Sequence, residues 1–263
     1  MIAEPDPAPC LVRLQQVSKR FSNGTQALQG LDLELRRGEF VSLLGPSGCG
    51  KSTALRLIAG LTTPSAGRVE WPATASGTDA GLGFVFQEPT LMPWRTVFAN
   101  VRLPLQVQGV SKAEATPRIR AALARVGLSA FERSYPRQLS GGMKMRVSIA
   151  RALVTAPRLL LMDEPFAALD EITRSRLNDD LLSLWASAGL TIAFVTHSVF
   201  ESVFLSSRIV VMAARPGRVV ANIAIDAPYP RDDDFRTSDT YNQYCRVVSA
   251  ALKSAMGETG HGV

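Results

Sequence analysis

Cysteine is scarce in this sequence, and long hydrophobic runs are missing from it. Its 263 residues include three scattered cysteines, Cys10, Cys49 and Cys245. No metal-ligand spacing links them, so the pattern excludes a disulfide framework and fits a reducing compartment. The longest apolar runs, such as Leu159–Met162 and Ile192–Val195, are far shorter than the roughly 20 residues that cross a bilayer. If the protein acts at a membrane, another chain must provide the spans.

A concentrated basic segment is also missing. The chain has 29 basic and 23 acidic residues, a net charge of +6. Because the basic residues are spread along the sequence, they favour a solvated basic surface over a nucleic-acid arm, and we expect no nucleic-acid partner. Residues Met1–Pro7 are acidic and proline-rich, unlike the basic and apolar parts of a signal peptide. The sequence therefore predicts a cytosolic protein.

The hydrophobic pattern alternates between short strands and helices. Apolar runs and apolar–polar alternation predict strands at Leu11–Val17, Leu28–Leu35, Phe40–Leu44, Gly81–Phe86, Arg158–Met162 and Leu190–Thr196. Helical spacing predicts helices at Ser52–Ala59, Val97–Val107, Lys112–Val126, Met143–Thr155, Glu171–Ala188 and Val199–Leu205. This alternation predicts an α/β fold, a parallel sheet with crossover helices. The helices between Pro93 and Ala156, with no strand among them, predict an inserted helical subdomain.

The residues after Asp226 have a different pattern. A polar loop with Pro228, Pro230 and three aspartates precedes the segment Tyr241–Met256. The apolar residues of that segment are spaced like one face of a helix. We expect a C-terminal helix packed on the domain, with a frayed tail as the alternative.

A glycine-rich loop lies between a predicted strand and a predicted helix. Its residues, Gly45, Pro46, Ser47, Gly48, Cys49, Gly50, Lys51, Ser52 and Thr53, match the phosphate-binding pattern G-x-x-x-x-G-K-[ST]. The glycines let backbone N–H groups approach phosphates, and the following helix points its positive end at the same anion. Lys51 is expected on the β/γ-phosphate oxygens and the Ser52 hydroxyl on Mg²⁺. A glycine-rich turn with a surface lysine is the alternative, which the strand–loop–helix context disfavours.

Two acids, Asp163 and Glu164, end an apolar strand that begins at Leu159. A strand so apolar is central, and its carboxyl end is expected beside the phosphate loop. Asp163 can hold Mg²⁺ through its water shell, and Glu164 can act as general base or orient the attacking water. The alternative is an acidic helix cap after a core strand.

A short glycine motif, Ser140-Gly141-Gly142, precedes a long helical pattern. Ser140 is a plausible N-cap, and the two glycines leave the helix N-terminus open to an anion. Taken alone, the motif is typical of an ordinary cap.

Together these motifs resemble the ATP-binding subunit of ABC transporters, from about Leu11 to Val220. In the family's order they are the Walker A loop Gly45–Thr53, the Q-loop at Gln87, the signature Leu139–Met143, the Walker B acids Asp163 and Glu164, the D-loop Ala168–Asp170 and the switch histidine His197. The resemblance implies a single ATPase domain over residues 1–263. Its P-loop NTPase (RecA-like) core would span about 11–92 and 157–225 and include a small antiparallel β subdomain. The helical subdomain would span about 93–156 and a C-terminal extension about 226–263.

The resemblance also implies roles that the single motifs do not carry. ATP and Mg²⁺ would be the cofactors, with His197 on the γ-phosphate and Gln87 as a ligand of Mg²⁺ or of the lytic water. Phe21 would stack on adenine; the alternative interpretation is a core phenylalanine on a strand. The nucleotide held by Lys51 would be contacted by Ser140, Gly141, Gly142 and Asp170, the first three from the second subunit of a dimer.

Two positions depart from the family pattern. Met143 ends the signature where Gln is common, and Ser198 follows His197 where Asp is frequent. Neither replaces a phosphate contact, so we expect activity to survive.

The segments Gln87–Val97, Asn100–Val101 and Arg215–Val219 resemble importers of nitrate, sulfonate or taurine, a group that also includes pyrimidine transporters. This resemblance implies a peripheral protein on the cytoplasmic face of the inner membrane. Its partners would be permease subunits, a second ATPase subunit, simplest as a homodimer, and indirectly a solute-binding protein. An exporter or lipid transporter would share every catalytic motif. A soluble ABC ATPase of DNA repair or translation would carry a coiled coil, zinc cysteines or a second ATPase domain.

Overall fold

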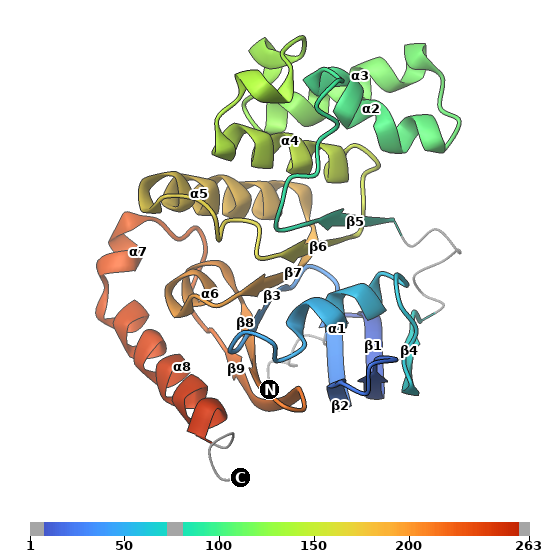
Figure 1. Cartoon of the computed structure of the whole chain (residues 1–263). Coiled ribbons are helices and arrows are strands. Elements are labelled where there is room, and N and C mark those ends of the chain that lie inside the picture. Colours follow the sequence, from blue (N-terminus) through green and yellow to red (C-terminus); the bar gives the residue numbers. More distant parts are fainter. Residues whose placement is uncertain (1–7, 73–80, 258–263) are drawn as a thin grey trace, which may run out of the picture.

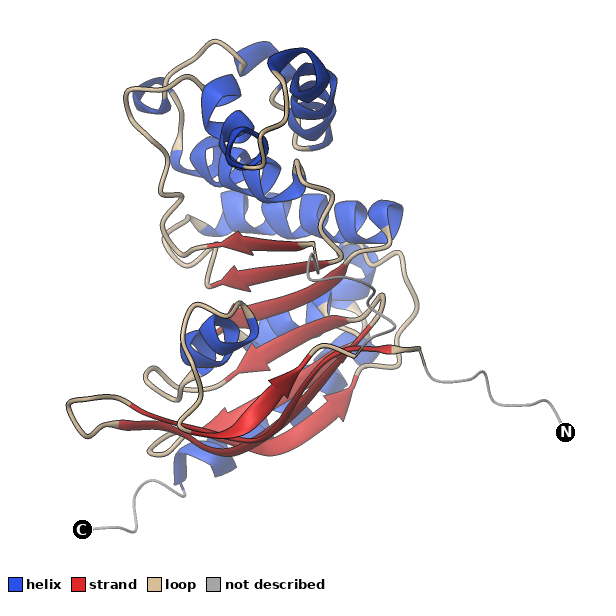
Figure 2. Ribbon diagram, turned by 90° about the vertical axis from the view of Figure 1, so that its right-hand side faces the viewer, coloured by secondary structure: helices blue, strands red, loops and turns tan. Residues whose placement is uncertain are grey.

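A six-stranded sheet forms the centre of the molecule in the computed structural model, which describes residues 8–72 and 81–257 (Figures 1 and 2). The prediction for Met1–Pro7 lies outside this range. The strand order is β5-β6-β7-β3-β8-β9, parallel except for β9. The strands are β3 (Phe40–Leu44), β5 (Leu82–Val85), β6 (Leu159–Asp163), β7 (Thr191–Thr196), β8 (Arg208–Ala213) and β9 (Arg218–Ala224). The parallel α/β prediction is confirmed, but β8 and β9 were not predicted.

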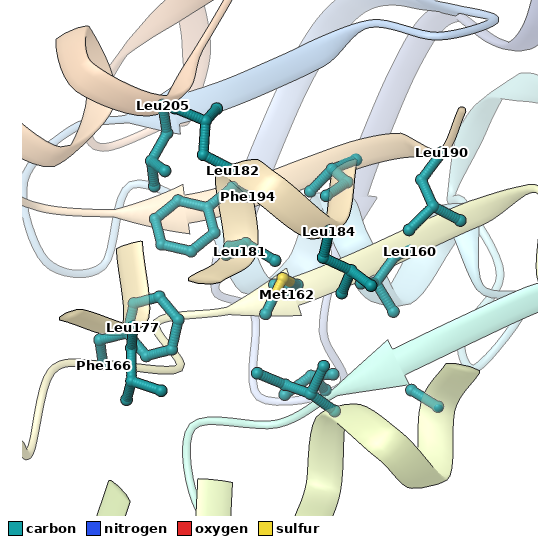
Figure 3. Close-up of a cluster of buried hydrophobic side chains, with 14 of the residues drawn as sticks. Leu160, Met162, Phe166, Leu177, Leu181, Leu182, Leu184, Leu190, Phe194 and Leu205 are labelled. Atoms are coloured by element: carbon teal, nitrogen blue, oxygen red, sulfur yellow. The ribbon is translucent and has the colours of Figure 1, made fainter. Parts of the chain in front are cut away.

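Both faces of this sheet are covered, which explains why its strands read as unbroken apolar runs. In β6, Leu160 and Met162 lie in one buried cluster, whereas Leu159 and Leu161 lie in the other. The first cluster includes leucines of helix α5 (Glu171–Ala188), which packs over β6 and β7 (Figure 3). The second includes helix α1 (Lys51–Ile58) and the smaller sheet.

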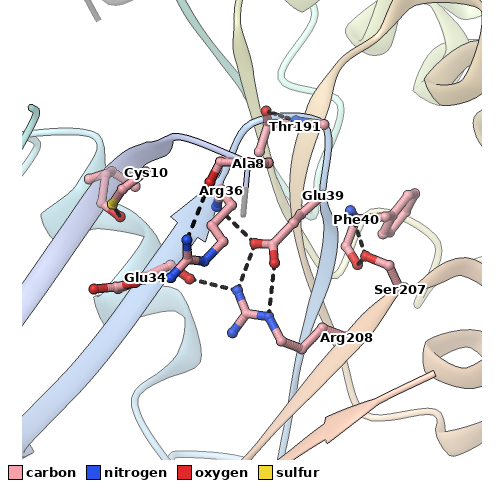
Figure 4. A network of polar contacts seen from close by, with 11 residues as sticks. Ala8, Cys10, Glu34, Arg36, Glu39, Phe40, Thr191, Ser207 and Arg208 are labelled. Carbon is pink, nitrogen blue, oxygen red and sulfur yellow. Dashed lines mark hydrogen bonds and ion pairs between the residues drawn. The ribbon is translucent and has the colours of Figure 1, made fainter. Parts of the chain in front are cut away.

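The smaller sheet has three antiparallel strands in the order β2-β1-β4. They are β1 (Cys10–Arg20), β2 (Gln26–Arg36) and β4 (Ala66–Glu70), of which β4 was not predicted. A polar network joins the two sheets (Figure 4). Arg208 of β8 donates to the Glu39 carboxylate at 2.7 Å and to the Glu34 carbonyl at 2.6 Å, and the Arg36 backbone N–H donates to Glu39 at 2.8 Å.

Three helices lie beyond α5 on the same side of the molecule (Figure 1). They are α2 (Val97–Val107), α3 (Lys112–Arg125) and α4 (Gly141–Leu153), with short 3-10 turns at Ser129–Phe131 and Pro136–Gln138. Thr96, Ser111 and Ser140 cap their N-termini by accepting a backbone N–H. The buried Asn100 amide fastens the preceding segment, since its oxygen accepts from the Met92 N–H at 2.8 Å.

The C-terminal part packs on the large sheet. Helix α8 (Asp239–Gly257) follows the short helix α7 (Asp233–Thr237) and contacts helix α6 (Val199–Leu205) and β8. Tyr241, Cys245 and Val248 are buried on its inner face. The packed C-terminal helix is therefore confirmed, and the frayed tail is wrong. Within residues 8–72 and 81–257, no helix has the length and hydropathy that a membrane span requires.

Candidate functional site

The glycine-rich loop follows β3 in the middle of the sheet and leads directly into α1. Gly50 precedes the helix with φ of 89° and provides no side-chain cap. A Cβ on Gly50 would lie 2.5 Å from Leu28 Cδ2 and 2.7 Å from the Ala27 carbonyl oxygen, so both the backbone angle and the space require glycine. The N-terminal N–H groups of α1 thus remain available to an anion.

Lys51 is buried at the start of α1. Its ammonium donates to the carbonyl oxygens of Gly45 at 2.7 Å and Pro46 at 3.0 Å, and it lies 4.0 Å from Glu164 Oε1. Carbonyls solvate a buried ammonium without neutralising it, so a positive charge remains for an anion above the loop.

Ser52 and Asp163 form a pair of oxygen ligands beside Lys51. The Ser52 hydroxyl donates to Asp163 Oδ1 at 2.7 Å. Burial raises the pKa of the Asp163 carboxyl, and the bond from Ser52 opposes this shift. A cation would relieve the cost of the buried negative charge, and hard oxygen ligands suit Mg²⁺. Gln87 is exposed two residues after β5, the sheet neighbour of β6, which places it on the adjacent loop.

The described ranges contain no group of three His, Cys, Asp or Glu side chains that could hold a metal ion by itself. Mg²⁺ commonly keeps several waters and is bound by one or two protein ligands together with substrate phosphates. The oxygens of Ser52 and Asp163 therefore fit the predicted ion.

Glu164 lies between the lysine and the predicted switch histidine. Its Oε2 atom is 3.3 Å from His197 Nδ1 and its Oε1 atom 4.0 Å from Lys51 Nζ. Its φ is +45°, an uncommon angle for a residue other than glycine. The Glu164 N–H donates to the Val195 carbonyl at 3.0 Å, which holds this turn against β7. Unusual backbone angles are often concentrated at functional sites.

The signature glycines lie apart from this cluster. Ser140 caps α4 by accepting from the Met143 N–H at 3.3 Å, which confirms the predicted cap. A Cβ on Gly142 would lie 2.8 Å from Thr173 Cγ2, so this segment packs tightly on α5. Within the described parts of the chain, no hydrogen bond or ion pair joins Ser140–Gly142 to Gly45–Thr53.

Among the described residues, Asp170 and Phe21 make no hydrogen bond or ion pair with Lys51, Asp163 or Glu164. Asp170 caps α5 by accepting from the Thr173 N–H at 2.9 Å, and this bond lowers the pKa of the carboxyl. Phe21 follows β1 and is 40% exposed, with Lys19 Nζ 5.4 Å from its ring centroid. Phe21 is therefore not a core residue of a strand, and its ring is accessible for stacking.

One supporting residue, Gly217, was not predicted. It lies in the β8–β9 turn, where its N–H donates to the Ala27 carbonyl and its carbonyl accepts from Gln29, both at 3.0 Å. A Cβ on Gly217 would lie 2.1 Å from the Cys49 carbonyl oxygen. The turn thus packs directly against the backbone of the phosphate loop. The sequence marks Arg215–Val219 by its resemblance to importers and by a turn signal, a glycine after a proline, and neither indicates what the turn contacts.

Comparisons with known proteins agree with this geometry. Residues 28–167 match the family model described as ABC transporter. The chain is 46% identical over 246 residues to an uncharacterized ABC transporter ATP-binding protein of Methanocaldococcus jannaschii, covering 92% of this chain and 91% of that protein. It is 47% identical over 204 residues to the taurine import ATP-binding protein of Yersinia pestis, covering 77% and 80%.

A solved structure with the same fold holds the products of ATP hydrolysis. It is a dimeric ATP-binding cassette in a post-hydrolysis state, bound to ADP and phosphate, with a TM-score of 0.71 and 34% identity. The match covers 83% of this chain and all of that one (100%). The chain therefore belongs to the ABC transporter family, as an ATP-binding subunit that hydrolyses ATP.

Proposed function

We propose that this chain is the ATPase of a membrane importer for a small solute, with sulfonates such as taurine as the first candidates. The observation that carries the ATPase assignment is the position of Glu164 between Lys51 and His197. Import is supported by the relative named for taurine import. Nitrate and pyrimidines stay as further candidates, because the solute is selected by other subunits.

Each site residue would have a separate role in ATP hydrolysis. Lys51, Thr53 and the N–H groups of Gly45 and Ser47–Ser52 would bind the phosphates, while Ser52, Asp163 and Gln87 would hold Mg²⁺. Bound Mg²⁺ would neutralise charge on the β- and γ-phosphates. Glu164 would orient a water and take its proton as the water oxygen attacks the γ-phosphorus. The bond to the β–γ bridging oxygen then breaks, which leaves ADP and phosphate.

His197 and Phe21 would complete the contacts within one chain. The His197 imidazole would donate a hydrogen bond to the γ-phosphate. The 3.3 Å contact between its Nδ1 atom and Glu164 Oε2 would hold the ring beside the base. The exposed ring of Phe21 would stack on adenine.

A second copy of the chain would complete the site. Ser140 is exposed at the N-terminus of α4, where the helix dipole and free N–H groups favour an anion. In the described parts of the chain, Ser140–Gly142 makes no hydrogen bond or ion pair with its own phosphate loop. From its exposure at the start of α4 we infer that it faces the γ-phosphate held by the other subunit, with Asp170 at the same junction. The dimeric cassette structure supports this arrangement.

The permease would contact a groove near Gln87. This groove, of about 820 Å³, lies between β5, α2 and α4 and is lined in part by Phe84, Leu103 and Val107. The Arg151 guanidinium donates to the carbonyls of Pro89 and Thr90, both at 2.9 Å, and so joins the groove to the segment after Gln87. We propose the division into core (about 11–92 and 157–225), helical subdomain (about 93–156) and extension (about 226–263), with the protein peripheral on the cytoplasmic face.

The test of this function is purification of the tagged chain with its partners from membranes of its source cells. We expect a multispanning permease, an extracytoplasmic solute-binding protein, and uptake of taurine or an alkanesulfonate that depends on ATP. A permease without a binding protein would support the export alternative. Hydrolysis stimulated by nucleic acid, with no membrane partner, would favour a soluble ATPase of repair or translation.

Gly217→Val is expected to weaken ATP binding by at least about tenfold, since its side chain meets the Cys49 carbonyl and must displace the phosphate loop. Titration with a fluorescent ATP analogue measures this effect. Gly257→Ala is a matched control, because a Cβ there meets nothing within 4 Å. Unchanged affinity in Gly217→Val would show that the turn does not support the loop.

A further inference from the structure

A cluster of buried and half-buried polar side chains lies where α5 meets α6, and it includes the residue that precedes His197. Its members are Thr196 at the end of β7, Glu201 on α6, and Arg174 and Asn178 on α5. The Thr196 hydroxyl donates to Glu201 Oε2 at 2.5 Å, and both residues are buried. Burial raises the pKa of the Glu201 carboxyl, opposed by the bond from Thr196 and the charge of Arg174. Burying a carboxyl without full hydrogen bonding destabilises the folded protein, which suggests that this residue has a function.

The cluster holds the backbone on both sides of His197. The Thr196 hydroxyl, already bonded to Glu201, accepts from the Ser198 N–H at 3.0 Å. The Ser198 hydroxyl in turn accepts from the Glu201 N–H at 3.2 Å. Both neighbours of His197 are thus hydrogen-bonded to Glu201, directly or through one further hydroxyl, so these bonds hold the backbone from which the imidazole projects.

The cluster also reaches the segment before α5. Arg174 donates to the Leu169 carbonyl at 3.0 Å, next to Asp170, while its Nε atom lies 3.9 Å from Glu201 Oε1. Arg174 Nε and Glu201 Oε1 are buried without a hydrogen-bond partner, as is Asn178 Oδ1. The pair is close enough for attraction but too far apart for a hydrogen bond, so a small movement of α5 toward α6 would shorten it.

We propose that Glu201 is a positioning residue for His197, with Thr196 as its link to the backbone and Arg174 as its link to Leu169 and Asp170. This inference rests on the proposed role of His197 at the γ-phosphate. The phosphate loop binds ATP through Lys51 and backbone N–H groups that do not contact the cluster. Loss of the cluster should therefore lower kcat and leave KM for ATP nearly unchanged.

The test combines isosteric variants with a double-mutant cycle. Thr196→Val removes the hydroxyl and is expected to lower kcat at least about tenfold with KM within about twofold. Thr196→Ser restores the hydroxyl and should recover most of the rate. In a His197→Ala background, Thr196→Val should cost almost nothing further, because both changes act through one side chain.

Each outcome of the cycle has a definite meaning. An equal loss of rate with and without His197, or a normal rate in Thr196→Val, would overturn the inference while leaving the proposed function intact. Full activity of His197→Ala alone would instead refute the proposed role of that histidine. Should Thr196→Val fail to fold, Glu201→Gln serves in the same cycle, since it keeps an acceptor for Thr196 and removes the charge facing Arg174.

Discussion

Glu164→Gln should bind ATP and form a stable dimer, yet hydrolyse ATP at least about 100-fold more slowly than wild type. Glutamine has nearly the shape of glutamate but cannot take a proton from water. Removing the charge would also end the repulsion expected between this carboxylate and a γ-phosphate bound by Lys51, since the Lys51 ammonium lies 4.0 Å from Glu164 Oε1. Steady-state hydrolysis, nucleotide titration and size-exclusion chromatography with light scattering measure the three effects.

Two further variants distinguish loss of the general base from a mere loss of charge and from a loss of ATP binding. Glu114→Gln removes an exposed acid from the first turn of α3 and should leave the rate unchanged. Lys51→Ala should lose ATP binding itself and therefore the dimer. Normal turnover in Glu164→Gln would refute the role of this residue as base. Slow turnover from a protein that remains monomeric with ATP would mean that the second half of the site comes from another chain.

The core of the fold could be predicted from the sequence because burial on both faces leaves a plain signal. Leu159–Met162 is apolar throughout, and it forms the buried strand β6. Strands β8 and β9 were missed for different reasons. Arg208–Ala213 carries the same buried apolar signal as β6 and was overlooked. In contrast, β9 is half-exposed at the sheet edge, so its pattern does not stand out locally.

The candidate site was predictable as chemistry but not as geometry. The motif order named Lys51, Asp163 and Glu164, and the structure brings them together. The left-handed backbone of Glu164 and the support by Gly217 depend on packing between distant segments, which no local pattern encodes. The proposed contact between the phosphate loop and Ser140 would involve a second chain, so the structure of one chain does not test it.

The C-terminal extension adds a contact to α6 that the sequence did not indicate. The Arg231 guanidinium is buried and donates to the carbonyls of Val203, Phe204 and Ser206 at 2.9–3.0 Å, which satisfies the C-terminal end of that helix. It also stacks on the Tyr229 ring, 4.0 Å from the centroid. Helix α6 thus has hydrogen-bond partners at both ends, Ser198 at its N-terminus and Arg231 at its C-terminus.

Asp163→Asn is expected to have two opposite effects, a more stable protein without nucleotide and an almost inactive enzyme. Asparagine keeps the oxygen that accepts from Ser52 at 2.7 Å, so the packing is preserved. As a neutral amide it is a poor ligand for Mg²⁺, and hydrolysis should fall at least about 100-fold. The buried charge disappears, and with it the cost that raises the pKa of Asp163.

The pH dependence of stability identifies the cause. Because the pKa of Asp163 is higher in the folded protein than the unfolded value of 3.8, the folded state binds the proton more tightly. The stability from this group is complete below pH 3.8 and is lost as pH rises through the folded pKa. Asparagine suffers no such loss, so the melting temperature of Asp163→Asn should exceed that of wild type by a few degrees at pH 7.5.

Thermal unfolding at several pH values, with and without Mg-ATP, tests both halves of this prediction. Without ligand, the advantage of Asp163→Asn should shrink as the pH falls toward the folded pKa of Asp163. Addition of Mg-ATP should reverse the order, since a ligand stabilises the folded state in proportion to its affinity and wild type keeps the carboxylate for Mg²⁺. A variant less stable than wild type at neutral pH would mean that burial of the Asp163 charge does not destabilise the folded protein. Equal stabilisation of both proteins by Mg-ATP would remove this carboxylate from the metal site.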